Sequence, residues 1–290
     1  MPLPSVRARL LAAAAALCAL VAGLPATDAD AAARSSQLRI GTYNVISRAP
    51  LDTFEAAVSR VKPQVDLLGL QEIGMNEKNW WLLGDPAWGY YRPPALQQNP
   101  VIWNRGRLEL VSAEGVQLSE AGSVEPLDGP YDETKLPNWA TVVRLRDLAT
   151  GELVTAINVH LVAYAISAGR FIPERPRTAR LYRSQLRALV GVVAAERRIA
   201  DDVYVLGDFN AGYEEDLRTR RGALPVRQLG AIGFRSMWEH SRLLPRSYGT
   251  HDNGALIDQV WHPTQPVATR ILRGVRGSDH RPVVATYAAG

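Results

Sequence analysis

Short apolar runs with the composition of buried β-strands recur along most of the chain, and their number limits the folds that it can adopt. Their Val, Ile, Leu and Tyr content suits the interior of a sheet. The runs are Leu38–Val45, Val65–Leu70, Val101–Trp103, Leu108–Val111, Ala140–Leu145, Leu153–Val159, Val203–Leu206, Leu256–Trp261, Val267–Leu272 and Pro282–Tyr287. These are too many strands for one open α/β sheet to accommodate.

Helical patterns are far fewer than strand patterns. Asp52 is placed to cap a helix over residues 52–61, which has its apolar residues on one face. A longer amphipathic helix is predicted over residues 177–200, and a weaker pattern covers residues 226–232. Residues 149–152 predict a tight hairpin turn. We therefore predict an α/β fold of four layers, in which two mixed β-sheets pack face to face and helices flank them.

The N-terminal residues have the features of an export signal. Early arginines are followed by an unbroken apolar run over residues 10–21, and Ala29-Asp30-Ala31 matches a cleavage pattern. The apolar run is short for a bilayer span, which favours secretion, with an uncleaved membrane anchor as the alternative. We predict a signal peptide at residues 1–31 and a single domain over residues 37–290.

The mature chain would contain no cysteine, because Cys18 lies within the predicted signal peptide. Disulfides and cysteine metal ligands are thereby excluded from it. The net charge is +4, and nearly all the cationic side chains are arginines. Arginine can grip phosphate through two hydrogen bonds. The charge therefore permits an anionic substrate such as nucleic acid or lipid phosphate, without requiring one.

Polar residues with catalytic chemistry stand at the ends of the apolar runs. They are Asn44, Glu72, His160, Asp208, Asn210, Asp258, Asp279 and His280. If two sheets pack together, these ends can converge on one rim, where the carboxylates would repel each other unless a cation neutralised them. Oxygen ligands suit a hard cation, so we predict Mg²⁺, with Mn²⁺ as the alternative. Zinc is disfavoured because the histidines show no zinc-type spacing.

The segments around these residues form an ordered set of short motifs. The set is Thr42-Tyr43-Asn44, Gln71-Glu72, Asn158-Val159-His160, Gly207-Asp208-Phe209-Asn210, Ile257-Asp258 and Ser278-Asp279-His280. It resembles the motifs of the endonuclease/exonuclease/phosphatase superfamily, a group similar to deoxyribonuclease I, exonuclease III and the neutral sphingomyelinases. The resemblance covers about residues 37–288. Single motifs of this kind occur by chance, but the whole set in order makes coincidence improbable.

The resemblance implies a metal site and a water site. Glu72, assisted by Asn44, would hold the divalent ion, and Asp279 would help to complete that site. Asp208 and Asn210 would position the attacking water, with Asp208 as a candidate proton acceptor. These roles match what phosphoester hydrolysis requires, namely an in-line water and neutralisation of the charge on phosphate.

The resemblance also implies roles for two histidines. His280, oriented by Asp258, would act on the nucleophile or the phosphate, and His160 would bind the scissile phosphate and could protonate the leaving oxygen. Some deoxyribonuclease-like members have a second histidine–carboxylate pair, whose acid precedes the strand that begins here near Val101. This chain has Gln97, Gln98 and Asn99 there, so the sequence leaves open whether His160 has a carboxylate partner.

Other residues are weaker candidates for contact with substrate. They are Arg170, Arg175, Tyr248 and His251. The arginines follow His160 in a loop near the expected rim, where they could clamp phosphate or begin a solvated helix. His240, His251 and His262 fit no motif and are interpreted as surface or loop residues, with contact to substrate as the alternative for His251. The aromatic-rich stretch 80–91 is expected to anchor the core or loops, or to contact bases or lipid.

The sequence therefore predicts a secreted, metal-dependent phosphodiesterase, with nuclease action as the leading expectation. Cleavage of a phospholipid headgroup, as in sphingomyelinases, or of an inositol or sugar phosphate is the alternative. A binding or toxin-like protein that keeps the fold without catalysis is a third possibility. No serine-hydrolase elbow or Walker-type phosphate loop is present in the sequence. No partner protein is implied, and we expect a monomer.

Overall fold

The computed structural model describes residues 37–74, 76–93, 98–220, 224–239 and 249–288. The predicted signal peptide with Cys18 lies outside the described residues, as do Gln97, His240 and Tyr248. Within the described part of the chain, no helix has both the length and the apolar character needed to cross a bilayer.

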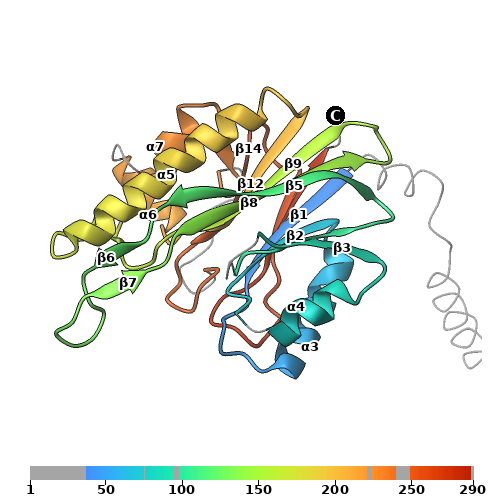
Figure 1. Ribbon diagram of the computed structural model, residues 1–290. Coiled ribbons are helices and arrows are strands. Elements are labelled where there is room, and N and C mark those ends of the chain that lie inside the picture. The colour runs from blue at the N-terminus through green and yellow to red at the C-terminus, as the bar shows by residue number, and fades with distance from the viewer. Residues whose placement is uncertain (1–36, 75, 94–97, 221–223, 240–248, 289–290) are drawn as a thin grey trace, which may run out of the picture. The chain divides into compact units, whose positions relative to one another are not determined.

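Two six-stranded sheets form the centre of the described domain (Figure 1). The first contains, in order, β15 (Ala268–Ile271), β16 (Val283–Ala288), β1 (Gln37–Asn44), β2 (Leu67–Gln71), β4 (Val101–Asn104) and β3 (Trp88–Tyr91). The second contains β13 (Arg235–Ser236), β14 (Asp258–His262), β12 (Asp202–Asp208), β9 (Leu153–His160), β8 (Asn138–Asp147) and β5 (Leu108–Ser119). Both sheets are mixed, because β1 pairs with β2 and β12 with β9 in parallel.

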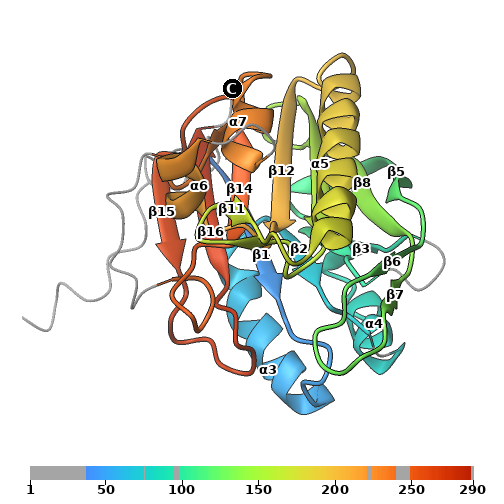
Figure 2. The ribbon, with the colours of Figure 1, turned by 90° about the vertical axis from the view of Figure 1, so that its left-hand side faces the viewer.

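Helices cover the outer face of each sheet (Figures 1 and 2). The first sheet is covered by α3 (Leu51–Val61) and α4 (Asn76–Leu83), with a 3-10 turn at Lys62–Gln64. The second is covered by α5 (Pro176–Glu196), α6 (Tyr213–Thr219) and α7 (Pro225–Gly230). Two short ribbons pair β6 (Gly122–Val124) with β7 (Glu133–Lys135) and β10 (Ile166–Ser167) with β11 (Arg170–Phe171).

The predicted sandwich of two sheets flanked by helices is confirmed, and every predicted apolar run overlaps a strand. The predicted hairpin turn at 149–152 joins β8 to β9, closed by a hydrogen bond from the N–H of Asp147 to the oxygen of Glu152 at 2.9 Å. The predicted cap at Asp52 is wrong, because α3 already begins at Leu51. Asp52 lies in the first turn, where its negative charge favours the helix N-terminus.

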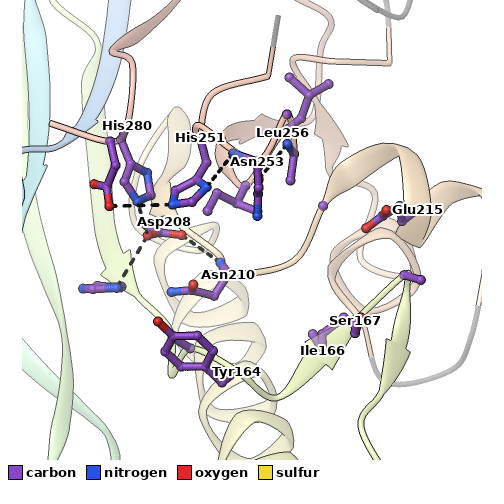
Figure 3. Close-up of a pocket in the computed structure, with 18 of the residues that line it drawn as sticks. Tyr164, Ile166, Ser167, Asp208, Asn210, Glu215, His251, Asn253, Leu256 and His280 are labelled. Carbon is purple, nitrogen blue, oxygen red and sulfur yellow. Dashed lines mark hydrogen bonds and ion pairs between the residues drawn. The ribbon is translucent and has the colours of Figure 1, made fainter. Parts of the chain in front are cut away.

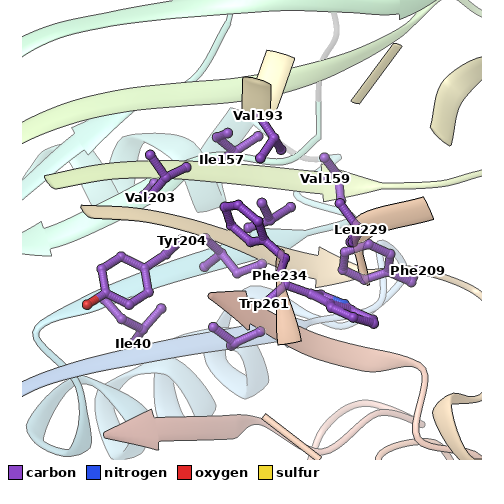
Figure 4. Packing of buried hydrophobic residues seen from close by; sticks show 14 of the residues in the cluster. Ile40, Ile157, Val159, Val193, Val203, Tyr204, Phe209, Leu229, Phe234 and Trp261 are labelled. Atoms are coloured by element: carbon purple, nitrogen blue, oxygen red, sulfur yellow. The ribbon is translucent and has the colours of Figure 1, made fainter. Parts of the chain in front are cut away.

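The core extends through both faces of the second sheet (Figure 4). One cluster joins Ile40 of β1, Ile157 of β9 and Val193 of α5, all fully buried. Strands buried on both faces do not alternate between apolar and polar residues. This explains why the runs that became β9 and β12 are apolar almost throughout.

A buried amide network ties the two sheets together beneath one end of the sandwich. Asn158 of β9 donates from Nδ2 to the main-chain oxygens of Leu70 at 2.9 Å and Asn99 at 3.0 Å. Its Oδ1 accepts a hydrogen bond of 2.6 Å from Nε2 of Gln71 in β2. Gly69 leaves the space for this amide, since a Cβ there would lie 2.6 Å from Oδ1 of Asn158. Because unpaired buried amides are costly, the network holds the two sheets in one alignment.

The interpretation of His262 as a surface or loop residue is wrong. His262 is buried at the end of β14, and its Nε2 lies 3.1 Å from Oδ1 of Asp202. Its ring stacks on Tyr204 with a centroid distance of 4.3 Å. The polar side chain is therefore satisfied within the core and belongs to no site.

Asp216 of α6 is a buried carboxylate that caps the next helix. Its Oδ2 accepts a hydrogen bond of 2.8 Å from the N–H of Val226, in the first turn of α7. Its Oδ1 has no hydrogen-bond partner among the described residues. Burial raises the pKa of Asp216 to about 7, against the smaller opposing effect of the Val226 hydrogen bond. The folded protein therefore favours the protonated form.

We expect this carboxyl to lower stability as the pH rises. Because the pKa of Asp216 is higher in the folded protein than in the unfolded chain, this carboxyl adds to the free energy of unfolding in full below about pH 4. That added stability is lost as the pH rises through about 7. At ~1.4 kcal/mol per pKa unit, the loss is roughly 4 kcal/mol at most. The stability of Asp216→Asn relative to the unmodified protein should therefore rise between pH 4 and pH 8, measured by urea unfolding. The matched control is Glu214→Gln, on the same helix but partly exposed; an equal rise there would contradict the assignment.

Candidate active site

Strand ends from both sheets meet at one rim and surround a cleft of about 620 Å³. The first sheet brings Asn44, at the end of β1, and Glu72, directly after β2. The second brings His160 and Asp208, at the ends of β9 and β12, and Asp258, at the start of the antiparallel β14. The predicted convergence of these positions on one rim is therefore what the structure shows.

Asn44 joins carboxylates that come from different sheets. Its Nδ2 donates to Oε1 of Glu72 at 3.0 Å and to Oδ2 of Asp208 at 3.1 Å. Its Oδ1 accepts from the N–H of Ile46 at 3.1 Å. If the amide were turned over, its Nδ2 would face the N–H of Ile46, which is also a donor. The nitrogen and not the oxygen therefore faces the two carboxylates. Asn44 thus links Glu72 of the first sheet to Asp208 of the second.

Glu72 presents a charged carboxylate to the cleft. Its Oε2 accepts a hydrogen bond of 3.0 Å from the N–H of Ser47. Burial alone would raise its pKa, but the charge of His160 and the hydrogen bonds from Asn44 and Ser47 outweigh burial and lower the pKa of Glu72. The buried Lys78 of α4 holds the loop behind it, donating to the oxygen of Ser47 at 2.9 Å. The carboxylate is therefore fixed and ionised.

Asp208 and Asn210 are positioned by a tight turn after β12. Asp208 is almost fully buried, and its Oδ1 accepts a hydrogen bond of 2.8 Å from the N–H of Asn210. The side chain of Asn210 donates to the oxygen of Leu161 at 2.9 Å. Gly207 has φ +145, and a Cβ there would meet the oxygen of Val159 at 2.0 Å. Only glycine permits this approach of β12 to β9, which sets the position of Asp208.

His280 is held by a buried carboxylate. Its Nδ1 lies 2.9 Å from Oδ2 of Asp258. Asp258 is fixed in turn by Thr250, whose Oγ1 accepts from its N–H at 3.1 Å. Burial alone would lower the pKa of His280, but the charges of Asp258, Asp208 and Asp279 outweigh it and raise the pKa to about 10. The ring is therefore held as an imidazolium at neutral pH.

Two histidines face Asp208 across the base of the cleft. Nε2 of His160 lies 3.6 Å from Oδ2 of Asp208, and Nε2 of His280 lies 3.7 Å from the same oxygen. Both distances exceed those of hydrogen bonds. Figure 3 shows Asp208 between His280 and Asn210 at the base of the cleft. Among the described residues, Asp208 is the carboxylate that lies within ion-pair distance of His160.

Asp279 lies on the same wall as His251. Its Oδ2 is 3.8 Å from Nε2 of His251, and the rings of His251 and His280 meet edge to face with a centroid distance of 4.8 Å. Oγ of Ser278 donates to the main-chain oxygen of Asn44 at 2.8 Å, which fixes this segment against β1. Asp279 and Glu72 both line the cleft.

The donor chemistry of the cleft fits a hard divalent cation. Carboxylate oxygens of Glu72, Asp208 and Asp279 reach the cleft, and such ligands suit Mg²⁺ or Mn²⁺. His251, Asp279 and His280 also bring ligand atoms within 4.8 Å of one another. Nδ1 of His280 is already engaged by Asp258. Glu72, fixed and ionised, is therefore the best-placed residue to hold a metal ion.

Strained backbone gathers at this cleft. Non-glycine residues with positive φ include Ile46, Glu72, Tyr164, Ala168 and Asn210, and all of these line the cleft. Such conformations are costly for side chains with a Cβ and cluster at functional sites. The observation supports placing the function here independently of the charged residues.

The predicted substrate contacts outside the motifs have mixed outcomes. His251 lines the cleft, whereas Tyr248 lies outside the described residues. Arg170 is exposed on β11, and Arg175 donates to the oxygen of Pro126 at 2.9 Å. Neither arginine lines the cleft. The structure therefore does not bring Arg170 and Arg175 to the position needed for a phosphate clamp.

Several residues of the cleft were not predicted from the sequence. They include Arg48, Tyr164, Ser167, Glu214 and Asn253. Figure 3 shows Tyr164 and Ser167 across the cleft from Asn253, with Glu215 of α6 at one end. Arg48 could have been predicted from the sequence, because it lies only four residues after Asn44, in the loop that leaves the rim. The remainder lie in loops without a motif.

Comparison with known proteins supports the same interpretation. The model of a family described as the Endonuclease/Exonuclease/phosphatase family matches residues 41–280. No curated protein sequence matches the chain.

Solved structures share the fold at low sequence identity. A humanized D. rerio TDP2 aligns with TM-score 0.63 and 15% identity, covering 87% of this chain and 98% of its own. The human Nocturnin catalytic domain aligns with TM-score 0.61 and 16% identity, covering 87% and 93%. A mannosyl-6-phosphatase of Bacteroides thetaiotaomicron aligns with TM-score 0.61 and 15% identity, covering 85% and 98%. At these identities the likeness shows the fold alone.

Proposed function

Because this chain belongs to the endonuclease/exonuclease/phosphatase family, whose members are metal-dependent phosphoester hydrolases, we propose that it is an exported, Mg²⁺-dependent phosphodiesterase that uses water as the nucleophile. The observation that carries the proposal is the position of Asp208. This buried carboxylate is bonded to Asn44 and faces the Nε2 atoms of His160 and His280. Water, phosphate and leaving group can meet at that point.

The residues divide the chemistry among themselves. Asp208 and Asn210 orient the attacking water, and Asp208 accepts its proton. His280, held as an imidazolium by Asp258, donates a hydrogen bond to a phosphate oxygen and does not act as a base. A metal ion at Glu72 would neutralise charge on the phosphate oxygens.

His160 completes the arrangement on the other side of Asp208. It lines the cleft at the end of β9, with Nε2 directed at Asp208. From this position it can bind the scissile phosphate and protonate the departing oxygen, which a leaving alkoxide requires.

Nucleic acid is the first candidate substrate, as the sequence predicted. One solved relative is a D. rerio TDP2 complexed with a single-strand DNA product, aligned with TM-score 0.58 and 15% identity. The positive net charge of this chain is compatible with a polyanion.

A small phosphoester is the second candidate, because the cleft itself is rich in carboxylates. Among the described residues, the carboxylates that line it are Glu72, Asp208, Glu214, Glu215 and Asp279, while the arginine is Arg48. A long polyanion would be repelled by such walls except where a cation intervenes. A sugar phosphate or a lipid headgroup brings one phosphate in place of a chain of phosphates, which reduces this repulsion.

Export rests on the N-terminal pattern alone. The apolar run at residues 10–21 and the Ala29-Asp30-Ala31 segment match a cleaved signal. We propose that the mature enzyme acts outside the cytoplasm as a monomer. N-terminal sequencing of the protein collected from culture medium tests the export and the cleavage point together.

A substrate screen tests the proposed function. Mature protein is given plasmid DNA, RNA, sphingomyelin vesicles and inositol or sugar phosphates, with Mg²⁺ and with EDTA. We expect hydrolysis of at least one class, abolished by EDTA and restored by Mg²⁺. Nuclease action should also weaken as salt rises, because binding to nucleic acid releases counterions. Hydrolysis that persists without any divalent metal would overturn the proposal.

A further inference from the structure

His160 stands between two hollows of the surface. On one side is the main cleft, and on the other is a pocket of about 290 Å³ that nothing in the proposed chemistry uses. His160 and Ala163 belong to the walls of both. A phosphate bound at His160 therefore has a separate hollow on each side of it.

Asn138, which lines the pocket, has a buried side-chain acceptor with no partner among the described residues. Nδ2 of Asn138 donates to the main-chain oxygen of His160 at 2.8 Å, which fixes the amide. Its Oδ1 is buried and has no hydrogen-bond partner among the described residues. Buried polar atoms are nearly always paired, so an orphaned acceptor in a pocket wall is a position where a ligand donor is expected.

The rest of the pocket wall carries little free charge. Lys135 pairs with Glu133 at 2.7 Å. Oε1 of Gln185 accepts from the N–H of Val162 at 2.9 Å. Leu136 and Val162 add apolar surface. The pocket therefore suits an uncharged group that has an apolar face and an N–H or O–H donor.

We infer that this pocket binds the second substituent of a phosphodiester, with Oδ1 of Asn138 accepting a hydrogen bond from it. The inference rests on the proposed function. A diester carries two groups on phosphorus, and the two hollows on either side of His160 accommodate one each. A monoester would leave the pocket empty and would bring a second negative charge among the carboxylates of the cleft.

Three chromogenic substrates with the same leaving group test the inference. They are the 4-nitrophenyl ester of thymidine 5′-phosphate, bis(4-nitrophenyl) phosphate and 4-nitrophenyl phosphate. The first is a diester with hydrogen-bond donors, the second is a diester without them, and the third is a monoester. We expect the unmodified enzyme with Mg²⁺ to prefer both diesters, by roughly 10-fold or more in kcat/KM, since a filled pocket changes selectivity by such factors.

Variants distinguish a pocket that binds the second substituent from an Asn138 that only holds the main chain of His160 in place. Leu136→Trp narrows the pocket from an exposed position, and should raise KM for both diesters while leaving the monoester unchanged. Asn138→Leu removes the acceptor and should affect the thymidine ester more than bis(4-nitrophenyl) phosphate. Asn138→Asp keeps an acceptor but loses the donor to His160, so it should change all three substrates alike. Leu148→Trp, at an exposed position in the β8–β9 turn, is the matched control.

The possible failures are distinguishable. Equal hydrolysis of the monoester and the diesters, or an equal loss on all three substrates in Leu136→Trp and Asn138→Leu, would overturn the pocket assignment alone. An enzyme that is active in the substrate screen but hydrolyses none of the three would also overturn the pocket assignment alone. Absence of hydrolysis of all three and of every substrate in the screen, with Mg²⁺ or Mn²⁺, would overturn both the proposed function and the inference.

Discussion

Replacing His280 with alanine is expected to reduce kcat by roughly 10²–10³-fold, the range typical of the loss of one hydrogen-bond donor that stabilises charge in a transition state. The imidazolium is paired with Asp258 at 2.9 Å and faces Asp208 at 3.7 Å. Its loss removes a charge that would stabilise phosphate in the transition state, and it leaves Asp258 buried without a counterion. Steady-state hydrolysis of the substrate found in the screen measures the effect.

The chain offers a matched control in His262. It is also a buried histidine paired with an aspartate, Asp202, but it lies outside the cleft. His262→Ala should lower the thermal midpoint and leave kcat close to that of the unmodified enzyme. A comparable loss of kcat in both variants, at temperatures where both are folded by circular dichroism, would show that His280 acts through stability and not through catalysis.

Removing the carboxylate of Glu72 is expected to have the largest effect on metal dependence. Outer-shell partners of a metal ligand typically alter metal affinity roughly 10–100-fold. Loss of the ligand itself should raise the Mg²⁺ concentration for half-maximal activity by about 100-fold or more in Glu72→Gln. Glutamine has one acceptor oxygen, so it can keep only one of the two hydrogen bonds, from Asn44 to Oε1 or from Ser47 to Oε2. Circular dichroism of the variant checks that it is folded.

Titration of activity with Mg²⁺, together with calorimetric binding of the metal, tests this expectation. Glu214→Gln is the control, because Glu214 also lines the cleft but lies on α6, away from the rim. Its Mg²⁺ midpoint should match that of the unmodified enzyme. The assignment of Glu72 fails if its variant binds Mg²⁺ with unchanged affinity, or if Glu214→Gln shifts the midpoint as much.

The larger elements of the fold were predictable because each has a pattern of apolar residues, over a continuous stretch of sequence, that indicates which of its faces are buried. The runs that became β9 and β12 are apolar on both faces, and α5 carries a clear apolar stripe. By contrast, α4 has a weakly amphipathic sequence. Strands β10, β11 and β13 are two residues long each, too short for any periodicity. Their pairing depends on tertiary context.

The candidate site was predictable to the extent that its residues follow strands. Asn44, Glu72, His160 and Asp208 all stand at strand ends, and the order of their motifs carried the resemblance. Contacts between distant segments were not predictable, such as the hydrogen bond from Asn44 to Asp208 across 164 positions. The orientation of the Asn44 amide likewise depends on neighbours that only the folded chain supplies.

The pocket beside His160 was also not predictable from the sequence. Asn138 begins β8 and carries no motif, and its role follows from where β8 lies beside the end of β9. The arginines of the 170–177 segment show the converse. Arg170 and Arg175 were candidates for phosphate contact, yet neither lines the cleft. Their neighbour Arg177, at the start of α5, pairs with Asp132 and with Glu125. Composition alone cannot say which charges are already neutralised within the fold.

The amide of Asn158 has a consequence for how such a protein can change. Its hydrogen bonds hold β9 to the end of β2 and to the segment before β4. Asn44, which bridges Glu72 and Asp208, lies at the same end of the two sheets. Any shear between the two layers would pull apart carboxylates that belong to a single reaction centre. New substrate specificities must therefore arise from substitutions in the loops around the mouth of the cleft. Substitutions where the two sheets pack against each other are tolerated only when residues on both sheets change together.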